Sequence, residues 1–305
     1  MTFKFLFWFI VLLFAFNPLM AKELNVICST SDLAWIAKKI GKEKITVKAL
    51  SDGDDNPHYL DATPKCVRLV SGADVLCFVG LELEIGWLPK VVQKSGNNKV
   101  KSDQIGYCDC STYVKVLEKP QGPIDRSMGD EHSGGNPHYQ LDPHQMLNVG
   151  KKILETLIKN RPEEENFYKK NFELLTSEID ILDLALKEKI KKLGVIKVTQ
   201  YHKELSYLID YLGLTSFESI EKVPGVSPSA ERIFSFGQEC KINEVKLCLA
   251  SVHSPSNKLT KFKSISQVPY LQERISLIDY LDEGAYEKMM TNLIDKIVLS
   301  QSSKK

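Results

Sequence analysis

Short apolar runs and longer amphipathic segments alternate in the first part of the chain. The apolar runs have the length of strands: Leu24–Cys28, Ile45–Leu50 and Ala73–Gly80. The segments between them have helical spacing; one begins at Ser31 or Asp32 and ends near Gly41, and the other runs from Thr63 to Gly72. This alternation predicts a parallel sheet covered by helices.

The middle of the chain has no strand signal and predicts two helices. The first runs from Pro143 to Lys159, and the second restarts at Pro162 and continues to Lys192, before Gly194. Apolar residues recur along the second at close to helical spacing. At 1.5 Å per residue it would be about 45 Å long, enough to span two small lobes.

After this long helix the alternation of strands and helices resumes. The predicted strands are Val195–Thr199, Glu244–Ala250 and Ile275–Ile278, and the predicted helices are Leu205–Leu212, Pro228–Lys241 and Ala285–Leu299. We therefore predict an α/β protein of two parallel-sheet lobes joined by one long rigid helix, with the ligand in the cleft between the lobes. The N-terminal lobe would comprise residues 22–161, the connecting helix 162–193 and the C-terminal lobe 194–305.

The first 21 residues have the pattern of a signal peptide. Lys4 gives a small positive start, Phe5–Phe16 is an apolar run of twelve residues, and the stretch ends with the small residue Ala21. A run of this length is too short to span a bilayer, which needs about 20 residues. We expect cleavage after Ala21 and export to the periplasm, without a lipid anchor because no cysteine follows the cut.

Charge and cysteine content narrow the possible partners and cross-links. The 40 lysines and arginines nearly balance the 39 acidic residues, so no bulk field would draw the protein to nucleic acid. We expect a monomer that binds no nucleic acid. The seven cysteines are odd in number and irregular in spacing, so a disulfide is permitted in an oxidising compartment but one thiol must stay unpaired within the chain.

Two histidines occur in the same four-residue frame, Asn-Pro-His-Tyr. The frame places His58 in residues 56–59 and His138 in residues 136–139, and the chain has only six histidines. Proline stiffens the backbone before each histidine, and Asp142 followed by Pro143 predicts a helix start just beyond the second. Such a backbone suits a histidine that holds a ligand, although two similar loop turns with surface histidines would give the same pattern.

Two further residues complete a possible metal-ligand set. His202 follows the predicted strand 195–199, and Asp279 follows the predicted strand 275–278, where open α/β sheets bind their ligands. Three imidazoles and a carboxylate, from His58, His138, His202 and Asp279, suit Zn²⁺, with Mn²⁺ or Fe²⁺ as alternatives. Protons compete with the metal for imidazole nitrogens, so metal affinity should decrease as the pH drops below about 6.5. With three histidines, more than one proton should be taken up for each metal ion released.

These motifs, in this order, resemble one protein family. The histidine frames, the runs 201–214 and 221–228, and the residues around Tyr286 and Met290 are similar to the zinc- and manganese-binding solute-binding proteins of bacterial metal ABC importers. The resemblance implies a two-lobed fold, a metal buried between the lobes and delivery to an ABC permease in the inner membrane. It places the ligands at His58, His138, His202 and Asp279. Asp282 and Glu283 are rivals for the last position, because the aspartate-proline pair usual in the family is absent.

Two other classes of protein fit the sequence less well than a binding protein. A zinc-dependent hydrolase would need an open coordination position, and no His-Glu-x-x-His or Gly-x-Ser-x-Gly motif occurs. An adhesin with a structural metal is the third possibility. We expect His132 to be a solvated residue of the exposed loop 119–135, His144 to point elsewhere, and His253 to be a possible rim ligand. A binding protein, not an enzyme, is the prediction.

Overall fold

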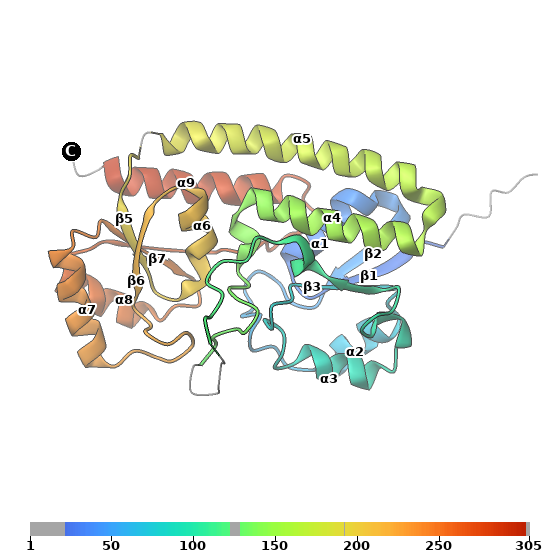
Figure 1. Ribbon diagram of the computed structural model, residues 1–305, viewed down its shortest axis with the longest axis horizontal. Helices are drawn as coiled ribbons and strands as arrows, with labels where there is room; N and C mark the ends of the chain where they lie inside the picture. The colour runs from blue at the N-terminus through green and yellow to red at the C-terminus, as the bar shows by residue number, and fades with distance from the viewer. Residues whose placement is uncertain (1–21, 123–128, 192, 303–305) are drawn as a thin grey trace, which may run out of the picture.

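The computed structural model describes residues 22–122, 129–191 and 193–302, so the predicted signal peptide lies outside the described residues. Its core is two sheets of four parallel strands. A long helix, α5, runs across both sheets (Figure 1). The predicted α/β class with two parallel-sheet lobes and one connecting helix is therefore confirmed.

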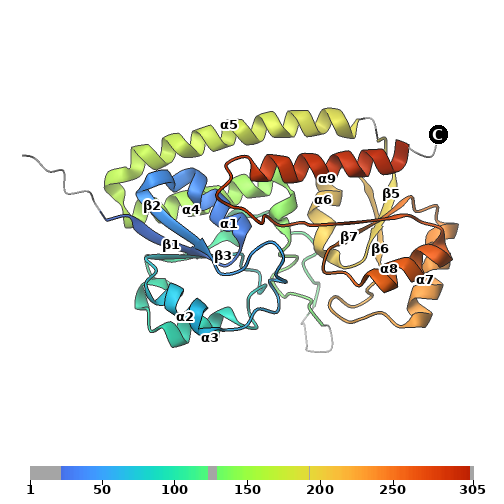
Figure 2. The ribbon, with the colours of Figure 1, turned by 180° about the vertical axis from the view of Figure 1, so that it is seen from behind.

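The N-terminal sheet has the strand order β2-β1-β3-β4. Its strands are β1 Leu24–Cys28, β2 Ile45–Ala49, β3 Val75–Phe78 and β4 Tyr107–Asp109. Successive side chains of β1 point to opposite faces of the sheet. Val26 therefore packs under one pair of helices and Ile27 under the other. The pair on one face is α1 Ser31–Gly41 and α4 Pro143–Asn160, and the pair on the other is α2 Pro64–Ser71 and α3 Leu88–Ser95 (Figures 1 and 2).

The C-terminal sheet repeats this arrangement with the order β6-β5-β7-β8. Its strands are β5 Lys197–Gln200, β6 Thr215–Ser219, β7 Leu247–Ser251 and β8 Tyr270–Glu273. Helices α6 Ser206–Tyr211 and α9 Ala285–Ser302 cover one face, and α7 Ala230–Ile242 and α8 Ser256–Ser266 cover the other. Because all strands in a sheet are parallel, the loops that leave their carboxyl ends gather at one edge.

The connecting helix α5, Glu165–Ile190, follows a 3₁₀ turn at Pro162–Glu164. Its buried face contains Leu175, Ile179 and Leu186 and packs on α1 and α4 of one lobe and on α9 of the other. Polar contacts fix both halves: Asn171 donates to the Ile40 carbonyl at 3.0 Å, and Asp183 accepts from the Tyr211 hydroxyl at 3.0 Å. The expectation of a single unbroken helix on both lobes is confirmed (Figure 2).

One predicted strand was wrong, and several short elements were not predicted. Residues 275–278 form no strand; the fourth strand of the second sheet is β8, which ends at Glu273. The apolar residues that suggested a strand are buried for another reason: the chain crosses back to the first lobe here, and the Leu277 N–H donates to the buried Asp32 carboxylate at 3.1 Å. The missed elements are short or polar, such as β4, β6 and α3.

Candidate metal centre

The two Asn-Pro-His-Tyr frames fold in the same local way. In each, the asparagine side-chain oxygen accepts a hydrogen bond from the histidine backbone N–H, at 3.1 Å for Asn56 and His58 and at 2.9 Å for Asn136 and His138. This turn, in which a side chain replaces a backbone acceptor, is typical of asparagine. The intervening proline restricts the backbone further, so both histidines leave the chain in a fixed direction.

The second frame is anchored to both lobes. Asn136 donates through its side chain to the Lys203 carbonyl at 2.6 Å and accepts at its own carbonyl from the Tyr207 hydroxyl at 3.0 Å. Tyr139 reaches back into the first lobe and donates to the Val79 carbonyl at 2.7 Å. His138 is buried as a result. Asp142 then caps α4 by accepting from the His144 N–H at 2.8 Å, as predicted.

His202 begins the turn that follows β5, and Glu221 orients its ring. The Glu221 carboxylate lies 2.8 Å from Nδ1 of His202, and the Gly225 N–H donates to the same oxygen at 2.9 Å. The two residues meet because β5 and β6 are neighbours and the Glu221 N–H donates to the Tyr201 carbonyl. With Nδ1 bound to the carboxylate, Nε2 of His202 is left to face a ligand.

The three histidines converge on one point. One ring nitrogen from each of His58, His138 and His202 lies within 4.8 Å of the other two, and the Nε2 atoms of His58 and His138 are 3.1 Å apart. A tetrahedral zinc ion with bonds of 2.0–2.1 Å to nitrogen would hold two such atoms about 3.3 Å apart. The spacing therefore fits a single cation bound by all three.

Burial keeps two of the imidazoles neutral. It lowers the pKa of His58 to about 3 and that of His138 well below its usual range, and the neighbouring His202 adds to both effects. Burial also acts to lower the pKa of His202, but the hydrogen bond that its Nδ1–H donates to Glu221 and the charge of Glu204 outweigh it and raise the pKa. Neutral imidazole is the form that binds metal, so protons compete less with a metal for His58 and His138 than for an ordinary histidine.

The fourth predicted residue lies apart from these three. Asp279 is exposed, and its carboxylate accepts from the Leu281 N–H at 2.9 Å. Its rivals are engaged by lysines: Asp282 with Lys288 at 2.5 Å, and Glu283 with Lys42 at 2.9 Å. The structure thus brings three of the four predicted residues together and leaves Asp279 outside the group.

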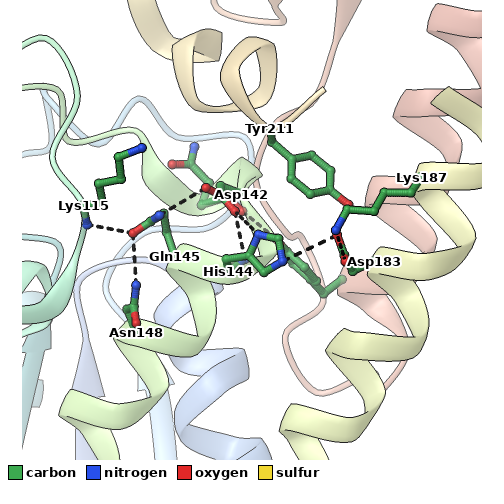
Figure 3. Close-up of polar contacts among 10 residues, drawn as sticks. Lys115, Asp142, His144, Gln145, Asn148, Asp183, Lys187 and Tyr211 are labelled. Atoms are coloured by element: carbon green, nitrogen blue, oxygen red, sulfur yellow. Dashed lines mark hydrogen bonds and ion pairs between the residues drawn. The ribbon is translucent and has the colours of Figure 1, made fainter. Parts of the chain in front are cut away.

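The other histidines differ in their relation to the group. His132 was expected to be solvated, but its ring stacks on His58 with centroids 5.2 Å apart, and its buried Nε2 has no partner in the described chain. His253 lines a cavity of about 240 Å³ that also reaches His58 and His202. His144 faces away; Figure 3 shows it between Asp142 and Asp183, at the junction of α4 and α5.

These features define a two-lobed α/β protein with a candidate metal site between its lobes. None of the helices in residues 22–122, 129–191 and 193–302 combines the length and the apolar character of a membrane span. The chain matches the ZnuA family, described as zinc-uptake complex component A, periplasmic, over residues 26–299. It belongs to that family, which confirms the family predicted from the sequence. The family is described as a component of a metal-uptake complex and its relatives as substrate-binding proteins, which agrees with the prediction of a binding protein and not an enzyme.

Individual relatives agree with this placement. A metal ABC transporter substrate-binding lipoprotein of Lactococcus lactis subsp. lactis is 31% identical over 177 residues, 55% of this chain and 51% of its own length. The manganese ABC transporter substrate-binding lipoprotein PsaA of Streptococcus pneumoniae serotype 4 is 28% identical over 185 residues, 58% and 54% of the two chains. The chain thus spans about half the length of the curated relatives it matches.

Solved structures share the fold. The crystal structure of ZnuA has a TM-score of 0.75 and 19% identity, covering 92% of this chain and 99% of that one. FpvC from P. aeruginosa, an SBP solved in complex with Ni²⁺, has a TM-score of 0.76 and 19% identity, covering 93% and 98%. At this level of identity, the likeness concerns the fold alone.

Proposed function

We propose that the protein captures a divalent transition metal outside the cytoplasm and delivers it to an ABC permease in the inner membrane. The observation that carries the proposal is the convergence of His58, His138 and His202, whose ligand nitrogens lie within 4.8 Å of one another. The burial that keeps His58 and His138 neutral supports the same reading. The metal is the cargo of the protein, so it must bind reversibly.

Zinc is the first choice for the cargo and manganese the second. Three imidazole nitrogens form a donor set that suits zinc, whereas manganese prefers more oxygen. The family description names zinc uptake, and the PsaA relatives are described as manganese proteins. Both metals therefore belong in the same competition experiment, with iron(II) as a third.

Asp279 remains the proposed fourth ligand. The chain just before it passes the site, since Ser276 and His138 line one small cavity. Leu277 is held by Asp32, whereas the Asp279 side chain beyond it is exposed. A turn of residues 278–281 toward the histidines would add a carboxylate and offset part of the charge of the cation.

The proposal also covers the location of the protein, its oligomeric state and the bounds of its lobes. We propose export with cleavage after Ala21, a monomer in the periplasm, and lobes at residues 22–161 and 194–305 joined by the helix at 162–193. Support for the location comes from the family description, which reads periplasmic. The histidines come from both lobes, so relative motion of the lobes would loosen the site and release the metal to the permease.

Metal-dependent thermal stability tests this function. A ligand that binds only the folded protein stabilises it by about 4 kcal/mol at a thousandfold excess over its Kd. Zinc should therefore raise the melting temperature of the wild type, and His138→Ala should lose most of that rise. His144→Ala is the matched control, because His144 lies outside the group and should keep the full rise. Retention of the rise in His138→Ala, or unfolding of metal-free His138→Ala, would contradict the proposal.

A further inference from the structure

A row of cysteines crosses the N-terminal sheet and includes none of the residues of the histidine group. Cys28 on β1 pairs in register with Cys77 on β3, and Cys77 pairs in register with Cys108 on β4. Cys110 follows in the 3₁₀ turn Cys110–Tyr113. All four side chains are fully buried. Four of the seven cysteines therefore lie together beneath α4, whose Lys152 carbonyl is 4.0 Å from the Cys108 sulfur.

Three of these sulfur atoms form a compact triangle. The Sγ atoms of Cys77, Cys108 and Cys110 all lie within 4.8 Å of one another, and those of Cys108 and Cys110 are 4.0 Å apart. A three-coordinate ion with metal–sulfur bonds of about 2.3 Å would hold its sulfur atoms about 4.0 Å apart. We propose that Cys77, Cys108 and Cys110 form a second metal site, which takes a soft thiophilic ion of the Cu(I) class.

The donor set distinguishes this site from the histidine site. Three sulfurs and no nitrogen or carboxylate in the triangle select a soft ion, for which Cu(I) is the biological example. Zinc also binds thiolates, but a structural zinc site has four ligands, and the compact group holds three. Cys28 contacts the row at Cys77 and lies outside the triangle.

Loading the site releases protons and involves no electron transfer. Burial raises the pKa of the Cys108 and Cys110 thiols well above their usual range, so without metal they are protonated. Each sulfur that bonds to Cu(I) as a thiolate gives its proton to solvent, and the copper remains Cu(I). Binding should therefore strengthen as the pH rises.

The edge of the sheet offers a route to the buried sulfurs. Cys108 lies on β4, a three-residue strand at the edge of the sheet that pairs only with β3 among the described strands. Short edge strands open locally at a lower free energy than the core of a protein. An opening of β4 and the turn after it would expose two of the three ligands together.

Competition for Cu(I) tests the second site. The full exported chain is titrated under anaerobic, reducing conditions against a chromophoric Cu(I) chelator. We expect one tightly bound Cu(I) per chain, with affinity reduced at least tenfold in Cys77→Ala and in Cys108→Ala. Cys66→Ala is the matched control, a buried cysteine of the same lobe outside the row, and should bind as the wild type does.

Several outcomes decide the proposal. His138→Ala should still bind Cu(I) tightly, because the cysteine site does not depend on the proposed function. If His138→Ala loses the copper while Cys77→Ala and Cys108→Ala still bind it, the proposal is overturned. A disulfide among the three cysteines in protein from its native compartment would also overturn it. If Cys77→Ala does not fold, Cys108→Ala decides. X-ray absorption of the copper-loaded protein should show only sulfur neighbours, and nitrogen neighbours would refute the site.

Discussion

Removal of the Glu221 carboxylate should weaken metal binding without touching a ligand. Glu221 lies 2.8 Å from Nδ1 of His202, and the two side chains are only 10% and 15% exposed. A hydrogen bond to a charged group contributes about 1.5–3 kcal/mol, and loss of such a partner behind a metal-bound histidine lowers affinity about 10–100-fold. We therefore predict that Glu221→Ala loses about 1.4–2.8 kcal/mol of binding free energy. Glu221→Gln keeps an acceptor oxygen without the charge and should lose less.

The assay is competition for zinc against a chelator of known affinity. It is repeated at two alkaline pH values, because protons compete with the metal for His202, whose pKa is raised, and an effect of the carboxylate itself should persist at both. Glu218→Ala serves as the control, because Glu218 is nearby but exposed and pairs with Arg232. Nitrogen chemical shifts of His202 should also report a change of tautomer in Glu221→Ala. A folded Glu221→Ala protein with the affinity and tautomer of the wild type would refute the reasoning.

Three further predictions follow from other contacts. Asp279→Ala should weaken metal binding at least tenfold, about 1.4 kcal/mol, whereas Asp282→Ala should change it little because the Asp282 carboxylate pairs with a lysine. The affinities are measured by competition with a chelator, and the reverse result would assign the fourth ligand to Asp282. The sequence alone predicts a pH dependence of more than one proton per metal, but the structure revises this to about one, below the raised pKa of His202, because the lowered pKa values of His58 and His138 delay their protonation. A calorimetric titration series with a steeper fall near neutral pH would contradict this. Burial raises the pKa of Asp32 to about 7, so the folded chain holds a proton that the unfolded chain loses near pH 4, and stability should fall as the pH rises between these values. Asp32→Asn should remove this pH-dependent decrease in the free energy of unfolding, which is at most on the order of 4 kcal/mol. Urea unfolding at several pH values measures it, and a difference between wild type and variant that does not change with pH would contradict the prediction.

Features that depend on near neighbours along the chain could be predicted from the sequence. The two Asn-Pro-His-Tyr frames could be interpreted because the asparagine that fixes each histidine is only two residues away. The cap at Asp142 and the apolar face of α5 are likewise local, so the helix start and the long helix were predicted. The three histidines could be named as a set because each follows or precedes a predicted element, and parallel strands gather such loops at one edge.

Contacts between distant segments could not be predicted in this way, because they depend on how the chain packs. Periodicity in residues 275–278 indicated burial, but only the fold shows that the buried chain crosses to Asp32 instead of forming a strand. The partner of His202 lies 19 residues away, and the outward position of Asp279 depends on a turn that no local pattern predicts. His132 stacks on His58 from 74 positions along the chain. Side chains on loops have no periodicity that fixes their direction, so the packing of the two lobes determines which of them meet.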